Sequence, residues 1–226
     1  MKKTISIFTD AFYPQLNGVV TYTLNITNEL ARRGNKVLLI YPKPKRGSKS
    51  PKLQLHENVK TIPVLGVKMR FYPDFQFTFP LQPQLPVSLK RYDVDIINFQ
   101  TPFTLGAEAI FYSQLMRKPL VGTFHTFVAT KEYISHSKVL SRMKNPEKAV
   151  WNFLKLFYNR SDRIISVSKY TKGELRKNGI RQPIDVINCN INFDKFGDRP
   201  SSIDIKDNAF VFVGRIAEEK NLKKLF

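Results

Sequence analysis

Short runs rich in Ile and Val recur along this chain of 226 residues and constrain its fold more than any other feature. The runs are continuous apolar segments rather than alternating ones, and helical stretches separate them. Strands buried on both faces of a parallel sheet have this pattern, and the helical stretches supply the crossovers that parallel strands need. We therefore expect an α/β fold with a doubly wound, Rossmann-like parallel sheet. The expected strands are residues 4–8, 36–41, 59–63, 95–99, 120–123, 163–167 and 185–187.

The intervals predict helices and long loops. Long loops in compact α/β domains are commonly functional, and they are expected at residues 42–58 and 66–80. The second loop carries aromatic side chains among prolines, and it either caps the core or meets an apolar acceptor. Its aromatic residues are Phe71, Tyr72, Phe75, Phe77 and Phe79. The expected helices are residues 20–33, 81–91, 105–117, 147–160 and 169–178, most of them ended by glycine, proline or a basic last turn.

The chain is strongly basic, since 37 Lys and Arg against 18 Asp and Glu give a formal net charge of +19. This charge favours an anionic partner, which could be a membrane surface, a nucleic acid or a phosphorylated substrate. The basic residues are scattered and match none of the usual RNA- or DNA-binding motifs. We therefore expect no nucleic-acid partner and favour an anionic membrane surface and a phosphorylated substrate.

The sequence also indicates a compartment. No apolar run is long enough to span a bilayer, and the run after Met1 is broken at Asp10, so neither a spanning helix nor a secretory signal is predicted. The lone cysteine, Cys189, has no partner for an internal disulfide or a zinc site, as is typical of a reducing compartment. We expect a cytoplasmic protein.

The loop after the first expected strand begins at Thr9 and Asp10 and ends in Asn17-Gly18-Val19 at a helix start. Ligands of open parallel sheets bind outside the carboxyl ends of the strands, where this loop lies. Gly18 would let the backbone approach a ligand. A tight turn with an ordinary capping Asn is the structural alternative, and the loop lacks the GxGxxG pattern of a dinucleotide site.

Other polar residues follow later strands at the same expected edge. His125 comes after the strand at residues 120–123, and it is either a ligand contact or a satisfied structural histidine. Ser168 follows the strand at residues 163–167 and suits the N-cap of the next helix. Ser168 and Lys169 are also candidates for a phosphate contact.

The end of the chain predicts a further anion site. Residues 210–213 read as a buried strand, Gly214 as a turn, and the following residues as a helix start that carries Arg215 and Lys220. Backbone N–H groups and the helix dipole at such a start favour phosphate oxygens. An apolar strand with no sheet of its own should pair with something, stay disordered or cause self-association.

The expected helix at residues 147–160 either packs on the sheet or faces a membrane. Its apolar stripe, with Val150, Phe153 and Leu154, suits packing on a sheet. The net charge favours the membrane alternative, because anionic lipid attracts each surface Lys or Arg by about 1 kcal/mol. The residues expected at a membrane contact are Trp151, Lys155 and Tyr158.

Several motifs together resemble the retaining GT-B glycosyltransferases of family four. The loop after the first strand is similar to the family signature D-x-F-x-P-x-x-N-G-V, and residues 119–126 resemble P-V-V-x-T-x-H-x. Residues 98–106 resemble H-x-x-x-P-x-x-L-G with Asn98 in place of His, and residues 161–171 resemble A-D-x-V-I-x-V-S-x-x-T. Residues 186–196 depart from V-I-P-N-G-V-D-x-x-x-F at Cys189, Asn190 and Asn192. Residues 213–222 resemble the segment that opens the donor-binding domain.

This resemblance implies a function for each candidate residue. His125 would be the catalytic-site histidine that bonds the donor sugar or its phosphate, and the loop with Asp10, Asn17, Gly18 and Val19 would contact acceptor or donor. Arg215 and Lys220 would grip the donor diphosphate. The donor would be UDP-glucose or GDP-mannose, with no metal or other cofactor and with retention of anomeric configuration. The aromatic loop looks most like members that glycosylate diacylglycerol, which implies a lipid acceptor and a place at the inner face of the cell membrane.

The resemblance also implies a domain organisation. Residues 1–188 would form the acceptor-binding domain, 189–208 a linker, and 209–226 the first strand and helix start of a truncated donor-binding domain. The family's E-x7-E element, which binds the nucleotide and sugar, does not occur in this sequence, so the chain alone is expected to be inactive. Two alternatives stay open: an inactive module that binds membrane or acceptor, and a glycosyltransferase with a soluble or polysaccharide acceptor.

Overall fold

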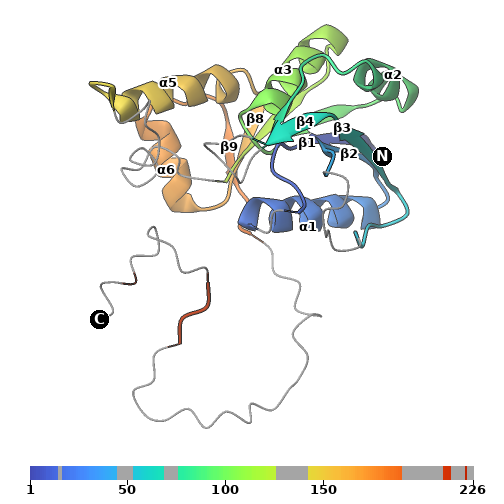
Figure 1. Ribbon diagram of the computed structural model, residues 1–226, viewed down its shortest axis with the longest axis horizontal. Coiled ribbons are helices and arrows are strands. Elements are labelled where there is room, and N and C mark those ends of the chain that lie inside the picture. Colours follow the sequence, from blue (N-terminus) through green and yellow to red (C-terminus); the bar gives the residue numbers. More distant parts are fainter. Residues whose placement is uncertain are drawn as a thin grey trace.

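The chain folds around a seven-stranded parallel sheet (Figure 1). The computed structural model describes residues 1–14, 17–44, 53–68, 76–125, 142–189, 211–214 and 222. Each strand lies within a residue or two of the position that its apolar run predicts. The strands are β1 (Thr4–Phe8), β2 (Lys36–Pro42), β3 (Val59–Val64), β6 (Ile96–Phe99), β7 (Leu120–Phe124), β8 (Arg163–Ser166) and β9 (Ile184–Val186).

The order of the strands determines where a ligand would bind. The sheet runs β3-β2-β1-β6-β7-β8-β9, and every neighbouring pair is parallel. The chain moves outward from β1 through β2 and β3 and then returns to β6 on the other side of β1. Ligands of open α/β sheets bind at such a reversal, beyond the carboxyl ends of the strands. The loops that follow β1 and β6 therefore form the first place to look for a site.

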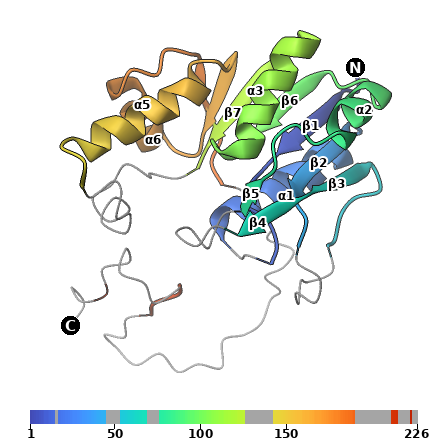
Figure 2. The same ribbon diagram turned by 45° about the horizontal axis from the view of Figure 1, so that its top comes forward.

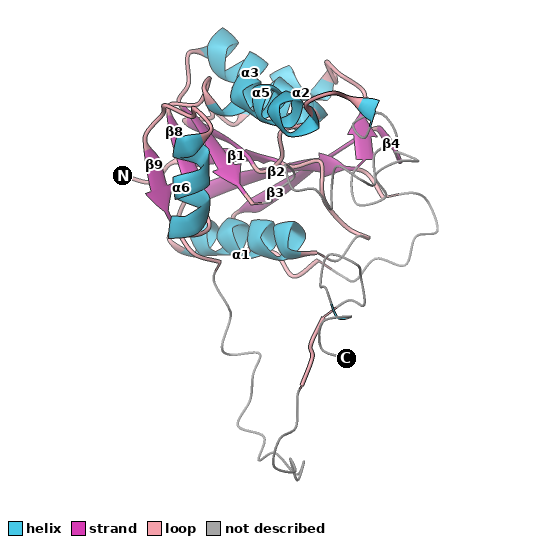
Figure 3. Cartoon of the chain, turned by 90° about the vertical axis from the view of Figure 1, so that its left-hand side faces the viewer, coloured by secondary structure: helices cyan, strands magenta, loops and turns pink. Residues whose placement is uncertain are grey.

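Helices cover both faces of the sheet, as a doubly wound fold requires. Figure 3 shows α2, α3 and α5 on one face and α1 on the other, and α3 lies between α2 and α5 in both ribbon views (Figures 1 and 2). Helix α6 packs against β8 and the edge strand β9. The helices are α1 (Gly18–Arg32), α2 (Gln84–Arg91), α3 (Thr104–Met116), α5 (Pro146–Tyr158) and α6 (Lys169–Lys177).

Strand β2 shows why the apolar runs are continuous. From Val37 onward every residue of β2 is buried, because alternate side chains enter two different cores. Leu38 and Ile40 pack with side chains of α2, α3 and α5, whereas Val37 and Leu39 pack with side chains of α1. The prediction of a doubly wound parallel sheet is confirmed.

The aromatic loop contains a hairpin that the sequence did not predict. Strands β4 (Gly66–Lys68) and β5 (Gln76–Thr78) pair in antiparallel fashion. The Gln82 side-chain amide closes the hairpin, donating to the carbonyl oxygens of Leu65 at 2.9 Å and Phe79 at 3.0 Å. Phe77 and Phe79 are 45% and 55% exposed, so these two rings do not cap the core. Phe71, Tyr72 and Phe75 lie outside the described residues.

Helix α5 faces the sheet differently from the prediction. Trp151 and Tyr158 are buried, and both pack against Phe124 of β7. The Tyr158 hydroxyl donates to the carbonyl oxygen of Thr123 at 3.1 Å. The expectation that Trp151 and Tyr158 contact a membrane is wrong for this structure, because the buried stripe centres on Leu154 and includes both rings. Phe153 and Leu156 are exposed instead.

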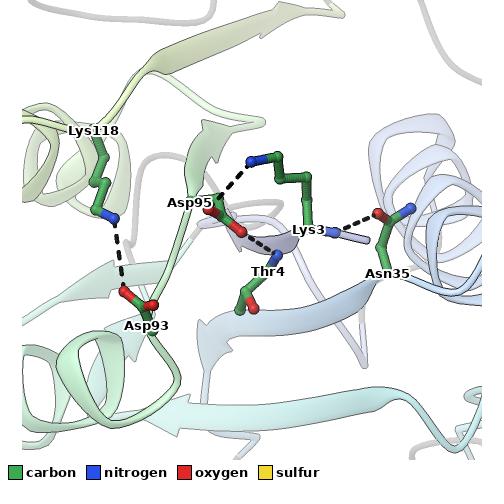
Figure 4. Close-up of polar contacts among 6 residues, drawn as sticks. All are labelled: Lys3, Thr4, Asn35, Asp93, Asp95 and Lys118. Atoms are coloured by element: carbon green, nitrogen blue, oxygen red, sulfur yellow. Dashed lines mark hydrogen bonds and ion pairs between the residues drawn. The ribbon is translucent and has the colours of Figure 1, made fainter. Parts of the chain in front are cut away.

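A set of charged residues ties the strands together at their amino ends (Figure 4). Asp95 accepts a hydrogen bond from the backbone N–H of Thr4 at 2.8 Å and lies 3.5 Å from the Lys3 ammonium. Asp93 pairs with Lys118 at 3.7 Å. Asp93 and Asp95 have the Asp-x-Asp spacing that can hold Mg²⁺ beside a nucleotide, but they lie at the edge of the sheet opposite the loops that follow β1 and β6. Across the described ranges no group of three or more metal-ligating side chains occurs.

The predicted second domain lies mostly outside the described residues, as do the linker, Arg215 and Lys220. Residues 211–213 are described, and they form no strand; Val211 is 74% and Val213 91% exposed. The strand predicted at residues 210–213 stays a prediction, because the rest of the predicted second domain lies outside the described residues. The domain boundaries remain predictions. No helix among the described residues is long and apolar enough to cross a membrane.

Candidate functional site

Asp10 joins the loop after β1 to the start of α3. Its carboxylate accepts from the hydroxyls of Thr101 and Thr104, both at 2.8 Å, and from the backbone N–H of Leu105 at 3.0 Å. The Asp10 N–H in turn donates to the Thr101 hydroxyl at 2.8 Å. Phe103, at the N-cap of α3, makes no capping bond with its own side chain. Asp10 therefore supplies from across the sheet the acceptor that a helix start needs.

Two buried carboxyl groups lie near this point. Burial raises the pKa of Asp10 to about 6, although the Leu105 N–H and the Thr104 hydroxyl oppose the rise. Burial, and next the charge of Asp10, raise the pKa of Glu108 on α3 to about 7. The backbone N–H of Leu81 opposes this rise in pKa, although it does not reach standard hydrogen-bond geometry. Both carboxyl oxygens of Glu108 are buried and have no hydrogen-bond partner among the described residues. Glu108 therefore keeps its proton below about pH 7, well above the range in which an exposed glutamate loses it.

The Asn17-Gly18-Val19 segment starts α1 at the same edge of the sheet. Asn17 is the N-cap, and its side-chain oxygen accepts from the backbone N–H of Val20 at 3.0 Å. Val19 is buried in the core on the α1 side. A Cβ placed on Gly18 would meet no atom of the described residues within 4 Å. Packing explains Asn17 and Val19, whereas nothing in the packing requires glycine at Gly18.

His125 follows β7 and lies next to α1. Its ring meets the ring of Tyr22 edge to face, with centroids 4.7 Å apart and planes at 73°. Its Nε2 lies 2.6 Å from Oε1 of Gln100, which follows β6. Burial lowers the pKa of His125 to about 3, so the imidazole is neutral at physiological pH. The structure thus brings His125 to the helix that Gly18 begins.

Ser168 and Lys169 lie further along the edge, after β8. The Ser168 hydroxyl accepts from the backbone N–H of Thr171 at 3.0 Å, which caps α6 as predicted. Lys169 is exposed. A phosphate contact by either residue stays a prediction.

Sequence reasoning missed Gln100, Tyr22, Thr101, Thr104 and Glu108. One signal was available, since Asn98 and Gln100 are two residues apart and therefore share one face of β6 and its extension. Because only Asn98 was considered, Gln100, the residue that contacts His125, was missed. The hydrogen bonds of Thr101 and Thr104 with Asp10 join segments more than ninety residues apart in sequence, so no local pattern indicates them.

Known proteins resemble this chain over almost its whole length. A GDP-mannose-dependent alpha-mannosyltransferase of Corynebacterium glutamicum is 25% identical over 231 residues, covering 98% of this chain and 53% of that protein. The alpha-monoglucosyldiacylglycerol synthase of Streptococcus pneumoniae is 25% identical over 232 residues, covering 97% of this chain and 50% of that protein. The chain spans about half the length of these curated relatives.

A solved structure and a family model agree with the likeness to these two relatives. A glycosyltransferase structure from Rickettsia africae superposes with a TM-score of 0.53 at 18% identity, over 99% of this chain and 49% of that one. This likeness confirms the Rossmann-like fold of GT-B glycosyltransferases. Residues 16–195 match the model of Glycosyltransferase Family 4. Because the match covers most of the sequence, the chain belongs to Glycosyltransferase Family 4.

Proposed function

We propose that this chain is the acceptor-side part of a retaining glycosyltransferase that moves a hexose from a nucleotide sugar to a membrane lipid or glycolipid. Membership of the family and the activities for which the two relatives are named support this proposal. The observation that carries it is the neutral His125, held by Gln100 after β6 and by Tyr22, which lies one helical turn after Gly18 in α1. The donor is UDP-glucose or GDP-mannose, and no metal ion takes part.

The proposed roles follow from the chemistry of each residue. His125 contacts the donor hexose, and the missing side chain at Gly18 leaves space for substrate against the start of α1. Arg215 and Lys220, outside the described residues, offset the charge that develops on the leaving diphosphate. In a retaining transfer, the bond from the anomeric carbon to the diphosphate breaks. The acceptor oxygen then bonds to the same face of the sugar and loses its proton.

The same proposal places the protein at the inner face of the cell membrane. Its net charge of +19 favours anionic lipid. Lys155 of α5 is partly exposed, and the neighbouring Phe153 and Leu156 are 40% and 54% exposed. These side chains, in place of the buried Trp151 and Tyr158, are the proposed lipid contact on α5.

Transfer of radiolabelled hexose tests the proposal. UDP-glucose and GDP-mannose are supplied with diacylglycerol in vesicles that contain phosphatidylglycerol. The chain is assayed alone and extended by the second half of the Streptococcus pneumoniae relative, with nucleotide binding as the check that the added half is folded. We expect label in lipid only with the extended protein, and NMR of the product should show the anomeric configuration of the donor.

Each other result has a defined meaning. Label on a soluble acceptor but not on lipid would replace the lipid acceptor with a soluble or polysaccharide one. No transfer by an extended protein that binds nucleotide would refute the enzyme proposal; vesicle binding by the short chain would then leave a binding module. A His125→Ala variant of the extended protein should bind nucleotide and lose transfer.

A further inference from the structure

Buried amide groups connect His125 to the backbone of β7. At the β7 end of this connection, Asn98 Nδ2 donates a hydrogen bond to the backbone carbonyl oxygen of Val121 at 3.0 Å. A carbonyl oxygen can only accept a hydrogen bond. The Asn98 side chain must therefore present its NH₂ group to Val121, which turns its Oδ1 toward Gln100.

The orientation of Gln100 follows from that of Asn98. The Gln100 NH₂ group donates to Asn98 Oδ1, and it also lies 3.3 Å from the hydroxyl oxygen of Thr123. The remaining amide atom, Oε1, faces His125 Nε2 at 2.6 Å. Since Oε1 can only accept, His125 must carry its proton on Nε2.

Burial keeps this arrangement in place. Asn98, Gln100 and Thr123 are 7%, 3% and 0% exposed, so water has little access to substitute for any partner. Reversing one amide would set two donors or two acceptors against each other, a loss of about 1–3 kcal/mol for each buried group left unpaired. The low pKa of His125, caused by burial, agrees with an imidazole that carries one proton only.

We propose that Gln100, oriented by Asn98, is a positioning residue that holds His125 as the Nε2–H tautomer and leaves Nδ1 as a hydrogen-bond acceptor. Nδ1 has no hydrogen-bond partner among the residues that the structure describes. A neutral acceptor bonds a hydroxyl group, and it repels a phosphate oxygen, which has no proton to give. The ligand group that His125 serves is therefore a hydroxyl of the hexose. Only this last step rests on the proposed function.

The tautomer can be measured without substrate. The sequence has only three histidines, His56, His125 and His136, so nitrogen–proton correlation NMR of the ring nitrogens gives few signals to assign. We expect His125 to show the Nε2–H pattern from about pH 5 to about pH 8, a range in which an ordinary histidine titrates. In the unmodified chain, an Nδ1–H pattern or an ordinary titration of His125 would overturn the proposal.

Variants separate positioning from packing. Gln100→Leu removes the acceptor, and the Nδ1–H form of His125 should then appear. Gln100→Glu keeps an acceptor oxygen, so Nε2–H should persist, and the added carboxylate should raise the pKa of His125. Thr123→Val is the matched control: it removes a buried hydroxyl from the same contacts but leaves Val121 to orient Asn98, so the tautomer should not change. An unchanged His125 signal in Gln100→Leu would refute the role of Gln100.

The ligand class is tested in the extended protein described above. Binding of GDP-mannose or UDP-glucose should shift the Nδ1 signal, and GDP or UDP alone should not. A shift with the nucleotide alone, or no shift with either sugar nucleotide, would refute the hydroxyl assignment while the tautomer measurement stands. Failure of hexose transfer with the Nε2–H tautomer observed would count against the proposed function and not against the positioning by Gln100.

Discussion

Replacement of Gly106 with alanine should destabilise the fold through the loop that carries Gln100 and Thr101. Gly106 lies in the first turn of α3, and a Cβ there would stand 2.2 Å from the carbonyl oxygen of Thr101. The obstructing atom is backbone, so α3 or the loop must move by about 1 Å to restore ordinary contact. Overpacking of this kind costs about 1–3 kcal/mol.

The helix propensity of alanine offsets part of this loss, by at most about 1 kcal/mol. We expect a net loss near the upper end, about 2 kcal/mol, because a shift of α3 also disturbs its contacts with Asp10. For a domain of this size this corresponds to a fall in Tm of about 4–8 °C. Urea unfolding followed by circular dichroism at constant m-value measures the change.

Gly173→Ala provides the matched control. Gly173 lies within α6, and a Cβ there would meet no atom within 4 Å. The same substitution should therefore stabilise the protein by up to about 1 kcal/mol. If Gly106→Ala unfolds at the urea concentration of the unmodified protein or above it, the close approach of α3 to Thr101 is not as tight as the structure has it, and the reasoning fails.

Three further predictions concern single side chains. Gly18→Ala should leave the urea midpoint unchanged or raise it slightly, because the new methyl group meets no described atom and alanine favours a helix, yet it should reduce hexose transfer by the extended protein; full activity would remove Gly18 from the site. Glu108→Gln should stabilise the protein at about pH 8 by roughly 2 kcal/mol and much less at pH 5. The reason is that burial raises the pKa of Glu108 to about 7, so the stability of the unmodified protein falls as pH rises through that value; an equal effect at both pH values would contradict this. Asp95→Asn should lower the urea midpoint at neutral pH, because the hydrogen bond from Thr4 stabilises the carboxylate and lowers the pKa of Asp95. The difference in midpoint between the variant and the unmodified protein should shrink in acid, where Asp95 gains a proton. A difference that stays constant as the pH falls would refute the assigned cause.

The middle of the sheet was predictable because β1, β2, β6 and β7 are buried on both faces, so their sequences are apolar for most of their length. The β4–β5 hairpin was not, since its strands have three residues each and depend on Gln82 for closure. The face of α5 was misjudged for a related reason. Periodicity locates an apolar stripe but does not say which ring meets Phe124, and that contact buries Trp151 and leaves Phe153 exposed.

The site was predictable only as far as the parallel direction of the strands could be inferred. Each candidate that follows a strand was placed correctly at the carboxyl edge, because parallel strands end together. The partner of each candidate was not predictable, since partners come from the neighbouring strand: Gln100 of the β6 loop for His125, and the start of α3 for Asp10. These residues are far apart in the sequence, and they come together only because β1 pairs with β6 and β6 pairs with β7.

The loop signature between Asp10 and Val19 combines two kinds of constraint. Asp10 caps α3, Phe12 is buried against Tyr41, and Asn17 caps α1, so the fold alone explains these residues. Gly18 has a different status: its backbone adopts an ordinary helical position, and a methyl group there would fit. Neither the conformation nor the described surroundings of Gly18 require glycine, and this supports the proposed contact of substrate with the start of α1. In the proposed function, the contacts of Asp10, Phe12 and Asn17 hold this open position one helical turn before Tyr22, the residue of α1 that contacts His125.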